Sequence, residues 1–401
     1  MTVIEKIKKV LRHKELRWFW RYACMAKLHI GRYTSKKVIL VRLDMIGDCT
    51  MFSSAAKAIC NHYKDRKVTV VCLSTTKPIF ERMGCFYEII PVDFKPTAID
   101  YSKLKKLIRQ LRSTEYDLLL QPQASKLPIA DIIDAAIKCN RRIALETKVG
   151  NSSARWVSMV NFLYDEFIPS PKGIVSEFDY YGAFVRGLGC PDYKTTCPSL
   201  PYHDQHFIEG NYYVIYPAGS FRQKFWPLDR VAKLADHIYQ KTGFIAVILG
   251  APHEKWVADE IKEKLHPLTA MSTIDLMGRT TIGDVVDIIG NAQFVISNDT
   301  SGVHIACATK TPSVVVVGGW HFKRFLPYHI EDIGPDDCLP IPAYTEMSCY
   351  YCDWNWDTIG ERNQECLHRM QQETPCTCID AVRYEQVCKL VDEMIERAQL
   401  C

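Results

Sequence analysis

The feature that most limits what this chain can fold into is an alternation of short apolar runs with longer helical stretches, which occurs twice along the sequence. Apolar runs bounded by charged or turn residues are typical of buried strands. Strands that alternate with helices predict right-handed βαβ units and a parallel sheet. The expected strands are 38–43, 68–73, 86–92, 117–121 and 141–145 in the first series, and 212–216, 244–249, 294–297 and 313–317 in the second. The expected helices are 49–63, 101–112, 128–138, 177–188, 227–240, 253–265, 281–290, 302–309 and 381–397.

The stretch between the two series predicts a two-domain protein. It carries Pro191, Pro198 and Pro201 and few periodic apolar positions, so it is typical of a linker. A length of 401 residues suffices for two domains of ordinary size. The predicted divisions are a basic aromatic helix in 1–36, a Rossmann-like domain in 37–190, a linker in 191–211, a second Rossmann-like domain in 212–380 with a cysteine-rich segment in 338–380, and a C-terminal helix in 381–401.

Positive charge is concentrated at the N-terminus. Residues 1–37 hold eleven Lys and Arg against Glu5 and Glu15, so the net charge of +4 for the whole chain leaves the remaining residues acidic. Residues 4–30 predict an amphipathic helix in which basic side chains alternate with a cluster of Trp and Phe. Such a helix suits an anionic membrane surface. Because many helices pack their aromatic residues on their own core, that second interpretation stays open.

Targeting signals are missing from the sequence. No apolar run approaches the roughly 18 residues that a membrane-spanning helix needs, and the N-terminus lacks the apolar core of a secretory signal. We therefore expect a cytoplasmic protein, which the basic helix could bring to the inner face of the cell membrane. We expect no nucleic-acid partner.

The first motif that carries chemistry is Val41-Arg-Leu-Asp-Met-Ile-Gly-Asp48, between the first expected strand and the helix after it. In open parallel sheets, ligands bind outside the carboxyl ends of the strands. Gly47 permits a tight turn there, and Asp48 is expected near the N-cap of the helix. The carboxylate of Asp48 is therefore either a helix cap, which contributes about 1 kcal/mol, or a general base that faces a cleft.

The second motif, Tyr216-Pro-Ala-Gly-Ser-Phe-Arg-Gln-Lys-Phe-Trp-Pro227, joins the first strand of the second series to a helix. Gly219 and Ser220 can offer backbone and hydroxyl donors to a phosphate group. Arg222 and Lys224 add positive charge. An ordinary βα loop with a solvated lysine is the alternative, but small residues beside two cations at the end of a strand favour an anion site.

The third motif, Phe294-Val-Ile-Ser-Asn-Asp-Thr-Ser-Gly-Val-His304, leads from a strand through a polar turn into a helix. The beginning of a helix presents unpaired backbone N–H groups to an anion. His304 is expected in the first turn of this helix, where it could reach the same ligand, although a single histidine is more often structural. The residues that form the expected site are Asp299, Thr300, Ser301, Gly302 and His304.

Several common fingerprints are absent. The sequence has no G-x-G-x-x-G after a strand, no G-x-x-x-x-G-K-[ST] and no G-x-S-x-G elbow. It also lacks D-x-D, an acidic pair that could hold a metal-bound diphosphate. Cations and helix ends would then have to stabilise a leaving diphosphate.

Taken together, the three motifs resemble those of glycosyltransferase family 9, the ADP-heptose:lipopolysaccharide heptosyltransferase family. The matching parts are Ile39–Asp48, Tyr213–Asp229 and Gly278–Gly318, and their order and spacing agree with those of the family. The resemblance implies a GT-B fold, in which two doubly wound Rossmann-like domains face a central cleft. The first domain is then expected to bind the acceptor and the second the nucleotide sugar, in an inverting, metal-independent transfer.

The resemblance also implies roles for individual residues. Asp48 corresponds to the base that deprotonates the acceptor hydroxyl, and a positioned base is worth about 10²–10⁴-fold in rate. Lys224 and Ser220 correspond to residues that hold the diphosphate of the donor. Asp299, Thr300, Ser301 and His304 correspond to the donor site. The chain departs from the family at Ser301, where a glycine is usual, and in the loop 318–323.

The seventeen cysteines fall into two groups. Nine are scattered from Cys24 to Cys307, mostly within apolar runs, as buried thiols are in a reducing compartment. The other eight lie between Cys338 and Cys401. A Cys-x₂-Cys pair with further thiols nearby suggests a structural zinc site, although reduced thiols without metal are an open alternative. The candidate ligands are Cys349, Cys352, Cys366 and Cys376.

The resulting hypothesis is a glycosyltransferase that extends a lipid-linked glycan, with heptose from ADP-heptose as the expected sugar and lipopolysaccharide core as the expected acceptor. No cofactor is expected for the transfer. The sequence leaves two alternatives, a nicotinamide-dependent oxidoreductase on a doubly wound scaffold and an inactive nucleotide-binding protein. The missing dinucleotide fingerprint argues against the first, and the presence of Asp48, Lys224 and His304 argues against the second.

Overall fold

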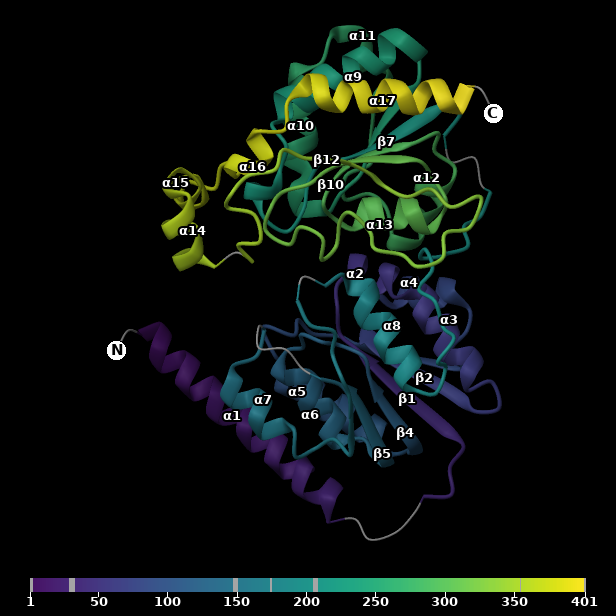
Figure 1. Cartoon of the computed structure of the whole chain (residues 1–401), viewed down its shortest axis with the longest axis vertical. Helices are drawn as coiled ribbons and strands as arrows, with labels where there is room; N and C mark the ends of the chain where they lie inside the picture. The colour runs from purple at the N-terminus through teal and green to yellow at the C-terminus, as the bar shows by residue number, and fades with distance from the viewer. Residues whose placement is uncertain are drawn as a thin grey trace. The chain divides into compact units, whose positions relative to one another are not determined.

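The computed structural model describes residues 3–28, 33–146, 151–173, 175–204, 208–353 and 355–399. The chain forms two compact units (Figure 1). The first comprises Met1–Cys49, Ala55–Gly173 and Asp179–Tyr193, and the second comprises Thr50–Ser54, Ile174–Phe178 and Lys194–Cys401. The domain boundaries expected near 190 and 212 stay predictions.

The first unit is built on a parallel sheet of six strands in the order β3-β2-β1-β4-β5-β6. Val38 in the central strand pairs with Val68 on one side and Leu118 on the other. The strands are β1 (Lys37–Arg42), β2 (Lys67–Leu73), β3 (Glu88–Val92), β4 (Glu115–Gln121), β5 (Lys138–Leu145) and β6 (Glu166–Ile168). The helices are α1 (Val3–Lys27), α2 (Ile46–Met51), α3 (Ser53–His62), α4 (Lys77–Met83), α5 (Tyr101–Arg112), α6 (Pro128–Ala136), α7 (Ala154–Val160) and α8 (Glu177–Gly187).

A buried polar cluster lies beside the apolar core of this unit. The ammonium of Lys126 is fully buried, 3.0 Å from Asp131. The hydroxyl of Tyr164 donates to Asp131 and Asp134 at 2.8 and 2.6 Å. Burial raises the pKa of Asp134 to about 6, although Lys126 opposes the shift. Because each charge has a partner, the cluster is tolerated inside the fold.

The second unit repeats the arrangement, with six parallel strands in the order β12-β11-β10-β7-β8-β9. The strands are β7 (Tyr212–Tyr216), β8 (Ile245–Ile248), β9 (Ile274–Asp275), β10 (Val295–Asn298), β11 (Ser313–Val316) and β12 (Ile341–Ala343). The helices are η1 (Arg222–Lys224), α9 (Leu228–Thr242), η2 (Pro252–Glu254), α10 (Lys255–Lys264), α11 (Pro267–Ser272), α12 (Ile282–Gly290), α13 (Ser301–Ala308), α14 (Trp356–Arg362), α15 (Gln364–Gln371), α16 (Thr377–Asp380) and α17 (Tyr384–Gln399).

Local sequence explains where several helices of this unit begin and end. Thr281 and Asp284 form a reciprocal capping box at the start of α12. Gly243 ends α9 in the left-handed region with φ of 69°, a conformation in which glycine is not strained. The indole N–H of the buried Trp226 donates to the carbonyl of Val382 at 2.8 Å, which fixes the segment before α17 against the start of α9.

The alternation predicted from the sequence is confirmed, and with it the α/β class. All nine expected strands are present, and β7 has the bounds expected for it. The short elements α4, α7, α11, β6, β9, β12 and α14–α16 were not predicted. The expected helix 49–63 is divided into α2 and α3.

Helix α1 has one face packed on the core of the first unit and another that is partly exposed. Phe19 and Ala23 are fully buried, and the rings of Phe19 and Trp156 lie 5.6 Å apart, so one face of α1 packs on its own core. Trp20 remains 40% exposed beside Phe162, with the ring centroids 5.9 Å apart. The side chains of residues 4–13, and residues 29 and 30, lie outside the described part of the chain. Within the described part, no helix is long and apolar enough to cross a membrane.

Candidate functional site

The strand order of the second sheet reverses between β7 and β10. Strands β8 and β9 extend from β7 on one side, and β11 and β12 extend from β10 on the other. Such a topological switch point is where open α/β sheets bind their ligands, outside the carboxyl ends of the strands. Ser297 pairs with Tyr216 near the ends of the two strands, so the loops that follow β7 and β10 leave the sheet side by side. These loops carry the second and third sequence motifs.

Lys224 lies in η1, within the loop that follows β7. Its ammonium is 4.9 Å from the centre of the Trp320 ring, a cation–π contact. The same charge acts on Asp299 and on His304, whose pKa values it lowers. Lys224 is therefore near both residues that the third motif supplies. It is the residue that joins the two motifs electrostatically.

The remaining predicted residues of this loop divide into two groups. Gly219 faces the second loop, since a Cβ built on it lies 3.6 Å from the Cβ of Thr300. Ser220 beside it is exposed. Arg222 has a different partner, because its guanidinium lies 4.2 Å from the centre of the Trp256 ring. The structure thus brings Gly219 to the third motif, while the guanidinium of Arg222 stacks on Trp256.

The loop after β10 leads directly into α13. Thr300 has extended backbone angles at the N-cap, and α13 begins at Ser301, whose hydroxyl donates to that of Tyr216 at 3.3 Å. Gly302 packs against the ring of Tyr216, where an added Cβ would lie 2.5 Å from a ring carbon. The glycine therefore allows the start of α13 to approach β7 closely. The first turn of α13 then presents its backbone N–H groups beside the loop of Lys224.

His304 is neutral at physiological pH. Burial lowers its pKa to about 3, and Lys224 lowers it further in the same direction. Its Nδ1 is hydrogen-bonded to the hydroxyl of Tyr328 at 2.6 Å, with the two rings stacked 5.8 Å apart. Burial raises the pKa of Asp299, against the influence of Lys224. The site therefore combines a lysine cation, a neutral imidazole and a helix N-terminus, a set suited to a phosphate group.

The first sheet has its own switch point, between β1 and β4. Arg42 at the end of β1 is buried and forms an ion pair with Asp44 at 2.9 Å. The side-chain amide of Gln123, which follows β4, donates to the same carboxylate. The hydroxyl of Tyr181 accepts from Arg42 at 3.0 Å. Sequence reasoning missed this network because its members come from three distant segments.

Asp48 lies at the same end of the first sheet. It is the third residue of α2, so it lies in the first turn of the helix, near the N-cap as expected. Its backbone carbonyl accepts from Arg42 and from Tyr181, both at 3.4 Å. These contacts hold the backbone of Asp48 to the end of β1. A half-buried carboxylate in this position can accept a proton from a hydroxyl group.

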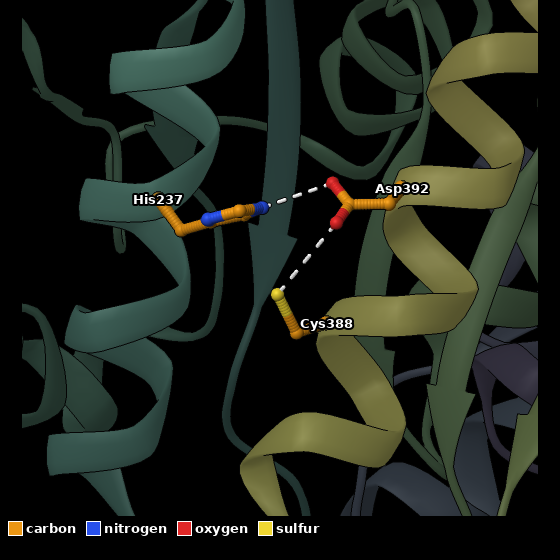
Figure 2. Close-up of side chains that lie close together, drawn as sticks. All are labelled: His237, Cys388 and Asp392. Carbon is orange, nitrogen blue, oxygen red and sulfur yellow. Dashed lines mark hydrogen bonds and ion pairs between the residues drawn. The ribbon is translucent and has the colours of Figure 1, made fainter.

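A group of three potential metal ligands lies elsewhere in the second unit. Among the described residues, His237, Cys388 and Asp392 have ligand atoms within 4.8 Å of one another (Figure 2). Asp392 accepts from His237 at 2.9 Å and also forms an ion pair with Lys241 at 2.9 Å. The carboxylate already has two cationic or hydrogen-bonding partners, so we interpret the cluster as a link between α9 and α17. It lies outside the candidate site residues named above.

Comparison with known proteins agrees with this geometry. Residues 186–333 match the sequence model of glycosyltransferase family 9 (heptosyltransferase). Lipopolysaccharide core heptosyltransferase OpsX of Haemophilus influenzae is 22% identical over 307 residues, 73% of this chain and 82% of that protein. Lipooligosaccharide heptosyltransferase 2 of Haemophilus ducreyi is 22% identical over 292 residues, 70% of this chain and 82% of that protein. The solved structure of E. coli ADP-heptose lps heptosyltransferase II has a TM-score of 0.66 at 15% identity, over 90% of this chain and 99% of that one.

Two doubly wound parallel sheets, each with polar side chains at its switch point, together with the likeness to that solved structure, define a protein of the GT-B fold. The family match within residues 186–333 and the two heptosyltransferase relatives identify the protein as a glycosyltransferase. They also confirm the resemblance of its three motifs to those of glycosyltransferase family 9. The alternative of a nicotinamide-dependent oxidoreductase is therefore wrong.

Proposed function

We propose that this glycosyltransferase transfers heptose from ADP-heptose to the lipopolysaccharide core or a related lipid-linked glycan. The observation that carries the proposal is the meeting of Lys224, Asp299 and His304 with the start of α13 at the β7–β10 switch point. The choice of donor is supported by the relative named an ADP-heptose lps heptosyltransferase. The choice of acceptor is supported by the relatives named for lipopolysaccharide and lipooligosaccharide.

The donor's diphosphate is assigned to the second unit. Lys224 provides a point charge for it, and the first turn of α13 provides backbone N–H groups. His304 is neutral and hydrogen-bonded to Tyr328, so it contributes as a hydrogen-bonding group and not as a cation. As the bond from sugar to phosphate breaks, negative charge builds up on the leaving nucleotide. Donors already aimed at this charge stabilise the transition state by several kcal/mol, about 2.7–4 for one donor in a comparable site.

The acceptor hydroxyl is assigned to Asp48. A sugar hydroxyl is a weak acid, so its attack on the donor requires a positioned proton acceptor. The carbonyl contacts of Asp48 to Arg42 and Tyr181 fix the backbone that carries this carboxylate. Direct attack by the deprotonated hydroxyl inverts the configuration of the sugar, and neutralisation by Lys224 and α13 makes the transfer independent of metal.

Contact with an anionic membrane surface is assigned to the exposed side of α1. Arg17 and Arg21 are exposed there, close in sequence to the half-exposed Trp20. A lipid-linked acceptor would be reached from such a surface.

The donor assignment is tested by nucleotide binding. Thermal unfolding of the full chain is measured with ADP, UDP, GDP and CMP, and ADP is expected to stabilise most, by about 2.7 kcal/mol at a hundredfold excess over Kd. Substitution Lys224→Met keeps the aliphatic stem and should weaken ADP binding about tenfold, the effect of losing a charge-assisted hydrogen bond. The exposed Lys264→Met serves as the control. Preference for another nucleotide would reject the donor, and ADP binding without transfer would revive the inactive alternative.

A further inference from the structure

Five cysteines of the C-terminal segment line one small cavity. The cavity has a volume of about 20 Å³ and lies within the second unit, where Gly319, Trp320 and Met370 complete its wall. The thiols come from the loop before α14, from α15 and from α16 with its N-cap. Those that line it are Cys349, Cys352, Cys366, Cys376 and Cys378. Residues spread over thirty positions of sequence thus line one cavity.

N–H groups approach two of these sulfur atoms. The backbone N–H of Gly319 donates to Cys378 Sγ at 3.4 Å, and the side-chain amide of Asn363 donates to Cys349 Sγ at 3.5 Å. Hydrogen bonds from N–H groups to sulfur stabilise the thiolate, which is the form that binds metal ions.

We propose that Cys349, Cys352, Cys366 and Cys376 bind a thiophilic transition-metal ion such as Zn²⁺ in a tetrahedral site. Four thiolates with one Cys-x₂-Cys pair form the usual ligand set of a structural zinc site. A tetrahedral site takes four ligands, so Cys378, the fifth thiol of the cavity, is assigned to the surrounding shell. Among the residues that the structure describes, no three of these sulfur atoms lie within 4.8 Å of one another, so coordination requires side-chain rotation toward the cavity that they share.

The same segment is bonded to the loop that carries Lys224. The backbone N–H of Cys376 donates to the carbonyl of Gln223 at 3.0 Å, and the amide of Gln223 donates to Met370 at 3.1 Å. Trp320, which lines the cavity, lies against the Lys224 ammonium. A bound metal ion would therefore hold in place the segment to which the Lys224 loop is hydrogen-bonded, and so stabilise the position of that loop. This last step rests on the proposed donor site, whereas metal binding itself does not.

Metal content of the full chain tests the proposal. The protein is purified without chelator under reducing conditions, and its metals are measured by elemental analysis. We expect a thiophilic metal equimolar with the chain, and a fall in unfolding temperature after removal by a chelator that added Zn²⁺ reverses. Titration of the metal-free protein with Co²⁺ should give the intense visible absorption of tetrahedral cobalt thiolates. Absence of metal together with no response to Zn²⁺ or Co²⁺ would overturn the site, as would an intact mass two hydrogens lighter, which indicates a disulfide.

Single substitutions assign the ligands. Cys352→Ser and Cys366→Ser should lose the bound metal, while Cys378→Ser, in the same cavity, and Cys60→Ser, a buried thiol of the first unit, should retain it. Retention in both ligand variants contradicts the assignment. If these variants do not fold, the Co²⁺ titration of the unaltered chain still decides. Weaker ADP binding after metal removal would support the proposed effect of the metal on the Lys224 loop. If the unaltered chain binds no ADP, the donor proposal fails, and the metal content still tests the metal site by itself.

Discussion

Asp48 is the carboxylate on which the proposed transfer depends at the scale of single residues. Asp48→Asn preserves the shape of the side chain but removes its ability to accept a proton. We expect kcat to fall by at least about 10²-fold while the Kd for ADP stays nearly the same, since the nucleotide is assigned to the other unit. Steady-state assays and ADP titration measure the two quantities.

A matched control for this variant is Asp65→Asn, an exposed aspartate of the same unit that should keep its activity. Unchanged turnover in Asp48→Asn would remove Asp48 from the role of base. Equal losses in the two variants would indicate a general effect of the substitution instead.

The residues that were predictable from the sequence are those inside contiguous motifs. Lys224, Asp299 and His304 belong to two βα loops, and parallel strands place such loops at one edge of a sheet. Trp320 and Tyr328 could not be foreseen, because their contacts to Lys224 and His304 depend on how a long loop returns to the site. Asp44 stood within the first motif, but its partner Gln123 follows a different strand.

At the scale of elements, the close packing of α13 on β7 depends on one glycine. Gly302→Ala would place a methyl carbon 2.5 Å from a ring carbon of the buried Tyr216, so the helix or the ring must move. We expect a loss of about 1–3 kcal/mol in the free energy of unfolding and weaker ADP binding, because the first turn of α13 is displaced. Denaturant unfolding and ADP titration check the two effects.

Gly219→Ala provides the contrast for stability. Its new methyl group would meet Thr300 at 3.6 Å, an ordinary van der Waals contact, so the free energy of unfolding should change little. Equal stability of Gly302→Ala and the unaltered chain would show that the tight approach of α13 to Tyr216 is not essential.

Long elements were predicted better than short ones for a physical reason. A helix such as α5 repeats its apolar positions over twelve residues and is capped by Asp100, so its pattern is clear. Strand β9 has two residues and β12 three, one of them Pro342, so neither shows a pattern of its own. Pairing with a longer neighbour defines both strands. Tertiary contacts of this kind are invisible in a local sequence window.

At the scale of the whole molecule, two histidines with lowered pKa values make stability depend on pH. Burial lowers the pKa of His304 and of His321 to about 3, well below the 6.5 of a free histidine. Between these values the unfolded chain binds protons that the folded chain does not, so the stability contributed at neutral pH is lost as the pH falls below about 6.5. His304→Gln should reduce this slope by about 1.4 kcal/mol per pH unit. Denaturant unfolding between pH 7 and 4 measures it.

The exposed His253→Gln is the control and should follow the unaltered chain. An identical slope in His304→Gln would mean that His304 is protonated in the folded protein, and the neutral imidazole assigned to the donor site would have to be abandoned.

The exposed aromatic pair on the first unit predicts binding to anionic lipid. Trp20 and Phe162 are 40% and 48% exposed, and Lys27 lies over the Phe162 ring at 6.0 Å. A basic and aromatic surface of this kind gains about 1 kcal/mol per cation near anionic lipid. We expect the chain to sediment with vesicles that contain phosphatidylserine and not with pure phosphatidylcholine.

The double variant Trp20→Ser with Phe162→Ser should lose this binding. Met271→Ser, which removes an 85% exposed apolar side chain from the second unit, should keep it. If the unaltered chain, the double variant and Met271→Ser sediment equally, α1 does not bind the membrane and only packs on the core of the first unit.

The polypeptide alternates repeatedly between the two compact units, because Thr50–Ser54 and Ile174–Phe178 belong to the second although their neighbours in sequence belong to the first. If the gene were divided within the linker 191–211, both short segments would be expressed with the first unit, although they belong to the second. Ser53 illustrates the loss, since its hydroxyl accepts the backbone N–H of Ser199 at 2.9 Å. The second unit expressed alone would therefore lack both segments. Chimaeras made from two relatives should fold only when both segments come from the same relative as the C-terminal part of the chain.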